Sequence, residues 1–157
     1  MANLCQNVIT FSGKNFEKGM VLFNDLIEEQ QRRQMGVRPS FCFEGRYLFD
    51  ISIEAEVIHC QTKWAPPLDV MREVGEYLDV DFEMEYQESG EPMFGRFWRE
   101  NGEFGAIELE DEDFNLVSYK EDIDRYVFEG EEYECQEEVL EIILERKLNT
   151  TLAGECN

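Results

Sequence analysis

The chain has 157 residues and is 43% hydrophobic, which predicts one domain with its own core and is too little for two ordinary domains. No apolar stretch approaches the roughly 20 residues of a membrane helix, and the opening MANLCQNVITFSG lacks the basic and apolar segments of a secretion signal. We therefore expect a cytoplasmic protein with no membrane partner. Its five cysteines are widely spaced and include no C-x-x-C pair, which favours free thiols over disulfides or zinc ligands.

Acidic residues dominate the charge. The chain has 36 Asp and Glu against 14 Lys and Arg, a formal net charge of -22 at pH 7. Residues 1–40 hold five basic and four acidic side chains, whereas residues 81–157 hold six basic and 24 acidic ones. Such a field repels nucleic-acid phosphates, so no direct nucleic-acid partner is expected. Two interpretations stay open: acidity that only keeps the protein dispersed, and an acidic decoy for a partner's basic surface.

The first half of the chain predicts the order strand, helix, strand, strand, helix, strand. Residues 7–13 form the first strand, and apolar residues spaced by three and four from Phe16 to Ile27 predict an amphipathic helix. The runs FCFEGRYLFDISI and EVIHCQTKW are the next strands, and the paired prolines after Trp64 end the second run and begin the helix PLDVMREVGEYLD. The alternating run VDFEMEYQE is the next strand. This order predicts an α+β, ferredoxin-like fold with a split βαβ antiparallel sheet.

The second half predicts a hairpin and a last helix. Asn101-Gly102 lies between two strand-like runs and predicts a two-residue turn. That turn places Trp98 opposite Gly105, Arg96 opposite Ile107 and Phe94 opposite Leu109. A helix is expected from about Tyr133 to Leu148. One domain is therefore expected over residues 1–148, with a C-terminal β-hairpin extension, a C-terminal helix and a flexible tail over residues 149–157.

The connection between residues 88 and 93 fixes which side chains share a face. If Phe82, Met84 and Tyr86 lie on the same face as Phe94 and Trp98, residues 89–92 must belong to an odd loop of three or five residues. A regular four-residue loop would instead set Glu85 beside Arg96. That ion pair, and not a ligand, would then explain the arginine. We expect the odd loop.

Three segments together carry a family resemblance: MANLCQNVITFSG, TKWAPP and YQESGEPMFGRFWRENGE. They resemble the Api-ninety-two-like, or YubB-like, family of phage and plasmid proteins with a ferredoxin-like domain. The resemblance covers roughly residues 1–105. It implies a fold and a mobile-element setting, and it carries no catalytic residues to this chain.

Catalytic and metal-binding patterns are not recognised in the sequence. His59, the single histidine, is expected to be a partly buried strand residue, and the cysteines form no nucleophile or metal pattern with it. The run Glu110–Asp113 lacks the spacing of a calcium loop and is expected to be a solvated turn. We expect no enzyme, cofactor or metal.

Two sets of residues remain as candidate sites. The protein-binding set is Glu110, Asp111, Glu112 and Asp113, which would occupy a basic surface of a host protein. The ligand-binding set is Lys63, Trp64, Arg96, Trp98 and Arg99, whose aromatic rings and cations suit a nucleotide-like molecule. For the second set, a structural alternative stays open: Phe94 and Trp98 belong to the core, Arg96 pairs with a carboxylate, Trp64 packs strand against helix and Lys63 is solvated.

The sequence therefore supports three hypotheses of function. The first is a non-catalytic phage or plasmid accessory protein that acts by binding, as an acidic anti-defence protein or nucleic-acid mimic. The second is a small-ligand binder or sponge that uses the aromatic-arginine hairpin. The third is a homo-oligomer assembled through an open sheet edge.

Overall fold

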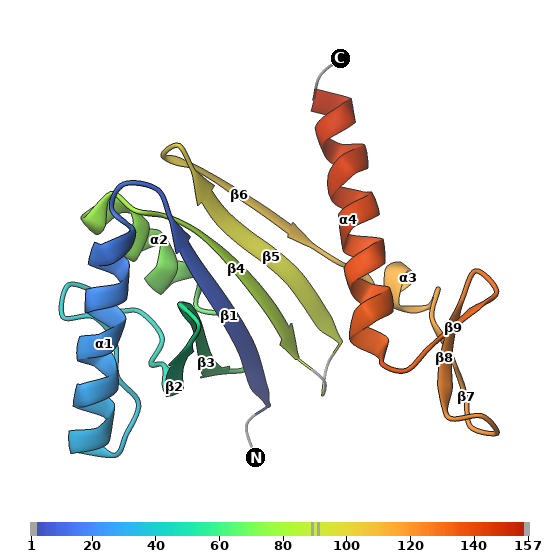
Figure 1. The fold of residues 1–157 in the computed structure, drawn as a ribbon, viewed down its shortest axis with the longest axis horizontal. Helices are drawn as coiled ribbons and strands as arrows, with labels where there is room; N and C mark the ends of the chain where they lie inside the picture. Colours follow the sequence, from blue (N-terminus) through green and yellow to red (C-terminus); the bar gives the residue numbers. More distant parts are fainter. Residues whose placement is uncertain (1–2, 89, 91, 156–157) are drawn as a thin grey trace.

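A computed structural model of the chain describes residues 3–88, 90 and 92–155. In chain order the elements are β1 (Leu4–Ser12), α1 (Phe16–Arg33), β2 (Phe49–Glu54), β3 (Val57–Lys63), α2 (Leu68–Leu78), β4 (Asp81–Glu88), β5 (Met93–Glu100), β6 (Glu103–Glu108), α3 (Asp111–Phe114), β7 (Ser118–Lys120), β8 (Arg125–Phe128), β9 (Glu131–Tyr133) and α4 (Gln136–Glu155) (Figure 1).

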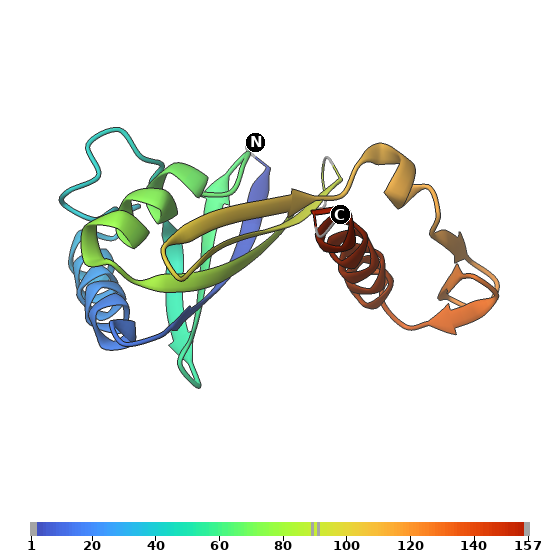
Figure 2. The same ribbon diagram turned by 90° about the horizontal axis from the view of Figure 1, so that it is seen from above.

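The ferredoxin-like prediction is confirmed. Strands β2, β3, β1 and β4 are neighbours in that order and pair antiparallel, with α1 and α2 on one face of the sheet (Figures 1 and 2). Strands β5 and β6 continue the same sheet beyond β4, which gives six strands. The hairpin also has the expected register, with Trp98 opposite Gly105 and Arg96 opposite Ile107.

Alternation along the strands separates two faces of the sheet. In β1, Cys5, Ile9 and Phe11 are buried in the core that α1 and α2 cover, whereas Gln6 and Thr10 are exposed on the other face. In β4, the residues Phe82, Met84 and Tyr86 belong to the same helix-covered core. We call the opposite face of β1 and β4 the open face; it carries Gln6, Thr10, Glu83, Glu85 and Gln87.

The odd-loop prediction between β4 and β5 is wrong. Glu88 pairs with Met93, so four residues lie between them, and Glu85 is opposite Arg96. The error came from the assumption that β5 buries a single face. In fact Phe97 joins the core under α1 and α2, while Phe94 joins a second core on the other side of the strand.

The second core was not predicted as a unit. It combines the strands β5 and β6 with α3, α4 and a three-stranded sheet of order β7-β8-β9, and its buried members are Phe94, Ile107, Leu109, Phe128, Val139, Leu140, Ile143 and Leu144. The last helix begins later than expected, because Tyr133 ends β9, and it continues past Leu148 to Glu155. The early part of the run at 41–53 is also not strand: β2 starts only at Phe49, and the segment before it is tied to the sheet through a bridge between Val37 and Leu48.

Trp98 fills the space over Gly105 on the neighbouring strand. A Cβ at Gly105 would meet the indole atoms Cε2, Cζ2 and Nε1 of Trp98. Gly105→Ala should therefore lower the free energy of unfolding by about 1 to 3 kcal/mol, because Trp98 must move out of its packed position. Urea unfolding measures the change, and Ala106→Ser, at the exposed next residue, is the control expected to stay within about 0.5 kcal/mol. Equal stability of Gly105→Ala and the wild-type chain would contradict the packing of Trp98 on Gly105.

Candidate functional site

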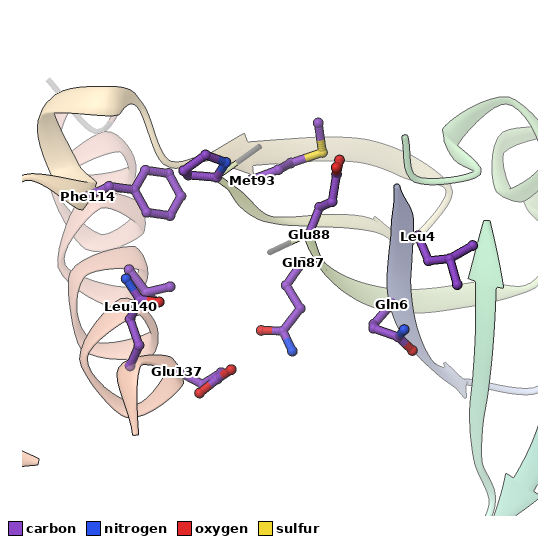
Figure 3. Close-up of a pocket in the computed structure, with 10 residues that line it drawn as sticks. Leu4, Gln6, Gln87, Glu88, Met93, Phe114, Glu137 and Leu140 are labelled. Atoms are coloured by element: carbon purple, nitrogen blue, oxygen red, sulfur yellow. The ribbon is translucent and has the colours of Figure 1, made fainter. Parts of the chain in front are cut away.

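Two hollows lie between the sheet and α4. One hollow of about 290 Å³ lies at the start of α4 and is lined by Leu4, Gln6, Gln87, Glu88, Pro92, Met93, Phe114, Gln136, Glu137 and Leu140 (Figure 3). A second hollow of about 490 Å³ lies farther along the helix and is lined by Thr10, Ser12, Phe82, Glu83, Arg96, Trp98, Arg99, Glu100 and Leu148. We call this region, with the side chains between the two hollows, the α4 groove.

The first hollow combines an apolar lining with hydrogen-bonding groups and no cation. Figure 3 shows Gln6 and Gln87 on the sheet side, with Glu137 and Leu140 across from them on α4. Phe114 of α3 closes one end. Amides and carboxylates accept hydrogen bonds, so this hollow suits a group that donates them, such as an ammonium or a guanidinium.

Arg96 stands at the centre of the groove between four glutamates. Its side chain is only 10% exposed, and its guanidinium lies 2.8 Å from carboxylate oxygens of both Glu141 and Glu145 on α4. On β4, the nearest oxygens of Glu83 and Glu85 lie 3.3 and 3.5 Å from its nitrogens. Arg96 therefore joins the sheet to α4, and the four-residue connection before β5 is what brings Glu85 beside it.

One arginine cannot neutralise four carboxylates. Burial and the neighbouring Glu141 raise the pKa of Glu85 to about 7, although the charge of Arg96 acts in the opposite direction. With all four glutamates ionised, the cluster carries three negative charges in excess. The cluster is therefore short of positive charge, and either a proton or a further cation relieves the repulsion.

Arg99 also lines the second hollow, but its ion-pair partners differ from those of Arg96. It pairs with Asp79 and Asp81 at 3.0 and 3.2 Å, and a Cβ at Gly75 of α2 would lie 2.8 Å from its Cδ. Its side chain therefore packs under α2, on the helix-covered side of β5. The hydrogen bond with Arg99 holds the pKa of Asp79 below its usual value.

Lys63 and Trp64 lie apart from Arg96. Lys63 is the last residue of β3 and Trp64 follows it, and β1 and β4 separate that strand from β5. Trp64 is 55% exposed and belongs to neither core, so it does not pack strand against helix as one alternative held. The structure thus separates Lys63 and Trp64, at the β3 corner, from Arg96, Trp98 and Arg99, which all line the second hollow.

The predicted protein-binding residues form the start of α3. Glu110 caps this short helix in a capping box with Asp113, which also pairs with Lys147 at 3.0 Å. Glu110, Asp111 and Glu112 are exposed. Their role in protein binding stays a prediction, and Asp113 has a structural role as well.

The residue types of common catalytic sites are dispersed. His59 is exposed on the open face opposite Val8, and not partly buried as expected. Burial raises the pKa of the Cys5 thiol to about 11 and that of Cys60 to about 12, which keeps both protonated. Among the described residues, no group of three or more His, Cys, Asp or Glu side chains is arranged to hold a metal ion.

The chain matches one known protein family. The sequence model of the ferredoxin-like domain in Api92-like protein matches residues 46–140. The chain belongs to this family. The match begins later than the resemblance seen at residues 1–105, and it reaches into the acidic last third and the first residues of α4. The family description of this Api92-like chain names a fold and no activity.

No curated protein and no solved structure matches the chain. Within the described part of this Api92-like protein, no helix is both long and apolar enough to cross a bilayer.

The sequence contains a signal for the groove in the spacing of its glutamates, which the predicted site residues did not include. Glu137, Glu141 and Glu145 repeat every four residues, which sets them along one side of a helix. Glu83 and Glu85 alternate along β4 and so share one face of the sheet. What no local pattern specified was that these two acidic rows face each other across Arg96.

Proposed function

We propose that this Api92-like chain is a non-enzymatic binding protein whose α4 groove receives a basic segment of a protein partner. The observation that supports this most directly is the convergence of Glu83, Glu85, Glu141 and Glu145 on the single cation Arg96. A lysine or arginine from a partner would supply the charge that the cluster lacks, and the first hollow has room and acceptors for such a side chain.

The partner that fits best is a host protein with a basic surface of the kind that normally holds nucleic acid. The net charge of -22 steers such a surface toward the chain, and the aligned acidic rows present negative charges along a groove. In that role the chain acts as an anti-defence protein or nucleic-acid mimic of a phage or plasmid, in the cytoplasm of the host. The nucleotide-like ligand at Arg96 is less well supported, because four glutamates already surround its guanidinium.

A fluorescent peptide of eight lysines tests the groove. Glu137→Lys should weaken its binding about threefold or more, because an added positive charge in the first hollow repels the probe. Glu138→Lys is the matched control: the adjacent residue is also exposed, lies in the same first helical turn and does not line the hollow. Fluorescence anisotropy measures both, and binding of the wild-type chain should weaken as salt rises because charges separated by more than about 8 Å are screened at physiological ionic strength.

A second variant separates the groove from α3. Reversal of Glu110, Asp111 and Glu112 to lysine leaves Asp113 and its pair with Lys147 in place. If this triple variant loses the peptide while Glu137→Lys binds like Glu138→Lys, the start of α3 is the binding surface and the groove proposal is wrong. If all variants respond only in proportion to net charge, the acidity serves solubility alone.

A further inference from the structure

The corner that follows β3 presents a large ring in a strained backbone conformation. Trp64 has φ of 71°, a region that bulky residues rarely adopt, and its N–H donates a hydrogen bond of 2.8 Å to the carbonyl oxygen of Asn3. The indole gains no core packing from this conformation, since it is 55% exposed. Strain that orders a residue without burying it is typical of functional positions.

Cations surround this corner. The Arg46 guanidinium donates a hydrogen bond of 3.2 Å to the carbonyl oxygen of Lys63, and the Lys63 ammonium lies 5.0 Å from the centre of the Phe49 ring. Arg38 lies 4.6 Å above the ring of Tyr47, the residue that follows Arg46.

Within the described part of the chain, Arg38, Arg46 and Lys63 form no ion pair, although the sequence has 36 acidic residues. Their positive charge is therefore available to a partner. We call the surface made by Arg38, Arg46, Tyr47, Lys63 and Trp64 the aromatic-cation patch.

The two rings of the patch are exposed to solvent. Tyr47 is 50% exposed and Trp64 is 55% exposed, and neither ring lines the hollows of the α4 groove. Protein partners usually insert side chains into well-packed pockets at their strongest contacts, whereas nucleic-acid bases stack flat on exposed rings. Phosphates between the bases then pair with Lys and Arg beside the rings.

The negative net charge is compatible with nucleic-acid binding at the patch, because most acidic residues belong to another part of the chain. Residues 81–157 hold 24 of the 36 acidic side chains. In the views of Figures 1 and 2, α4 and the β7-β8-β9 sheet lie at one end of the long axis, with α1, α2 and the segment that joins α1 to β2 at the other. At physiological ionic strength charges farther than about 8 Å are largely screened, so the acidic end of the molecule opposes the patch only weakly. The expectation of no nucleic-acid partner was based on the net charge of -22.

We propose that the aromatic-cation patch binds single-stranded nucleic acid, with a base stacked on Trp64 and the adjacent phosphates held by Arg46 and Lys63. Tyr47, with Arg38 over its ring, extends the platform toward a neighbouring nucleotide. This surface is separate from the α4 groove, so binding of a basic partner and of a nucleic-acid strand are independent properties.

Fluorescence titration with an oligonucleotide of thymidines tests the proposal. The chain has two tryptophans, so Trp98→Phe leaves Trp64 as the single reporter. Stacking should quench Trp64 emission as the oligonucleotide is added, and Trp64→Ala should weaken binding about tenfold in an anisotropy assay with a labelled oligonucleotide. Tyr119→Ala, which removes a ring that is 50% exposed in the acidic part, should bind like the wild-type chain.

Two double variants with the same change in net charge test the cations. Arg46→Gln with Lys63→Gln should weaken binding strongly, whereas Lys14→Gln with Lys18→Gln removes the same total charge at exposed positions outside the patch and should have little effect. Equal losses in the two double variants, or equal affinity for base-free polyphosphate, would overturn the proposal. So would the absence of quenching by the thymidine oligonucleotide, or quenching by a glutamate-tyrosine copolymer alone, which would assign the patch to an acidic protein segment.

Discussion

Replacement of Arg96 by alanine is expected to detach α4 from the sheet and to lower the free energy of unfolding by about 3 kcal/mol or more. The side chain is buried, and its removal leaves glutamates from β4 and α4 facing each other without a cation. Repulsion between like charges then adds to the loss of the ion pairs. Urea unfolding measures the stability, and limited proteolysis within α4 reports whether the helix has left the sheet.

Two further variants separate charge from packing. Arg99→Ala removes an arginine with the same 10% exposure whose partners, Asp79 and Asp81, do not belong to α4, so α4 should stay protected from protease. Arg96→Met combined with Glu85→Gln and Glu141→Gln leaves two of the four unpaired carboxylates and should recover part of the lost stability. If Arg96→Ala keeps both wild-type stability and a protected α4, the arginine cluster does not hold the helix.

The core of the fold could be predicted because its signals are local. In β4 the alternation of Phe82, Met84 and Tyr86 with polar residues specifies a strand with one buried face. Asn101-Gly102 specifies the hairpin and its register. The prolines after Trp64 specify the start of α2. Each of these depends on a few neighbouring residues, and together they leave a small number of ways to arrange the sheet.

The groove could not be predicted, because it depends on relations between distant residues. The length of the connection between β4 and β5 decides whether Glu85 or a core residue of β4 lies opposite Arg96. A change of one residue reverses the answer, and composition alone does not specify that length. The position of α4 depends on the second core, whose short strands and α3 carry weak sequence signals. One alternative from the sequence correctly paired Arg96 with a carboxylate. Predicting that four glutamates surround it would have required both the register of β5 and the position of α4.

Both arginines of β5 show how this sheet uses its acidic residues. Arg96 pairs with Glu83 and Glu85, and Arg99 pairs with Asp81. The three carboxylates come from alternate residues of β4 and so from its open face. Arg99 has two aspartate partners, whereas Arg96 has four glutamate partners, so most of the excess negative charge lies around Arg96.

The stability of α4 on the sheet should decrease as pH rises from about 5 to 8. In the folded chain the pKa of Glu85 is about 7, because the carboxyl is buried and close to Glu141, whereas its ordinary value is 4.5. Between these two values the folded state binds more protons than the unfolded state, so the free energy of unfolding decreases as pH rises through this range. The groups that face Glu85 are Arg96, Glu83 and Glu141, and Arg96 stays charged throughout. The slope should stay below the one-proton limit of about 1.4 kcal/mol per pH unit.

Urea unfolding at pH 5, 6, 7 and 8 measures this dependence, and Glu85→Gln is the decisive variant. It should flatten the curve and be more stable than the wild-type chain at pH 8, because it removes the unfavourable buried charge. Glu132→Gln, at an exposed position of β9, should keep the wild-type slope. Asp113 does not contribute in this range: the hydrogen bond from the Glu110 backbone and the charge of Lys147 lower its pKa, so its stabilising effect is lost only as pH falls below its ordinary value of 3.8. Parallel curves for the wild-type chain and Glu85→Gln would show that Glu85 is ionised in the folded protein at pH 5 and that the cluster already has enough positive charge.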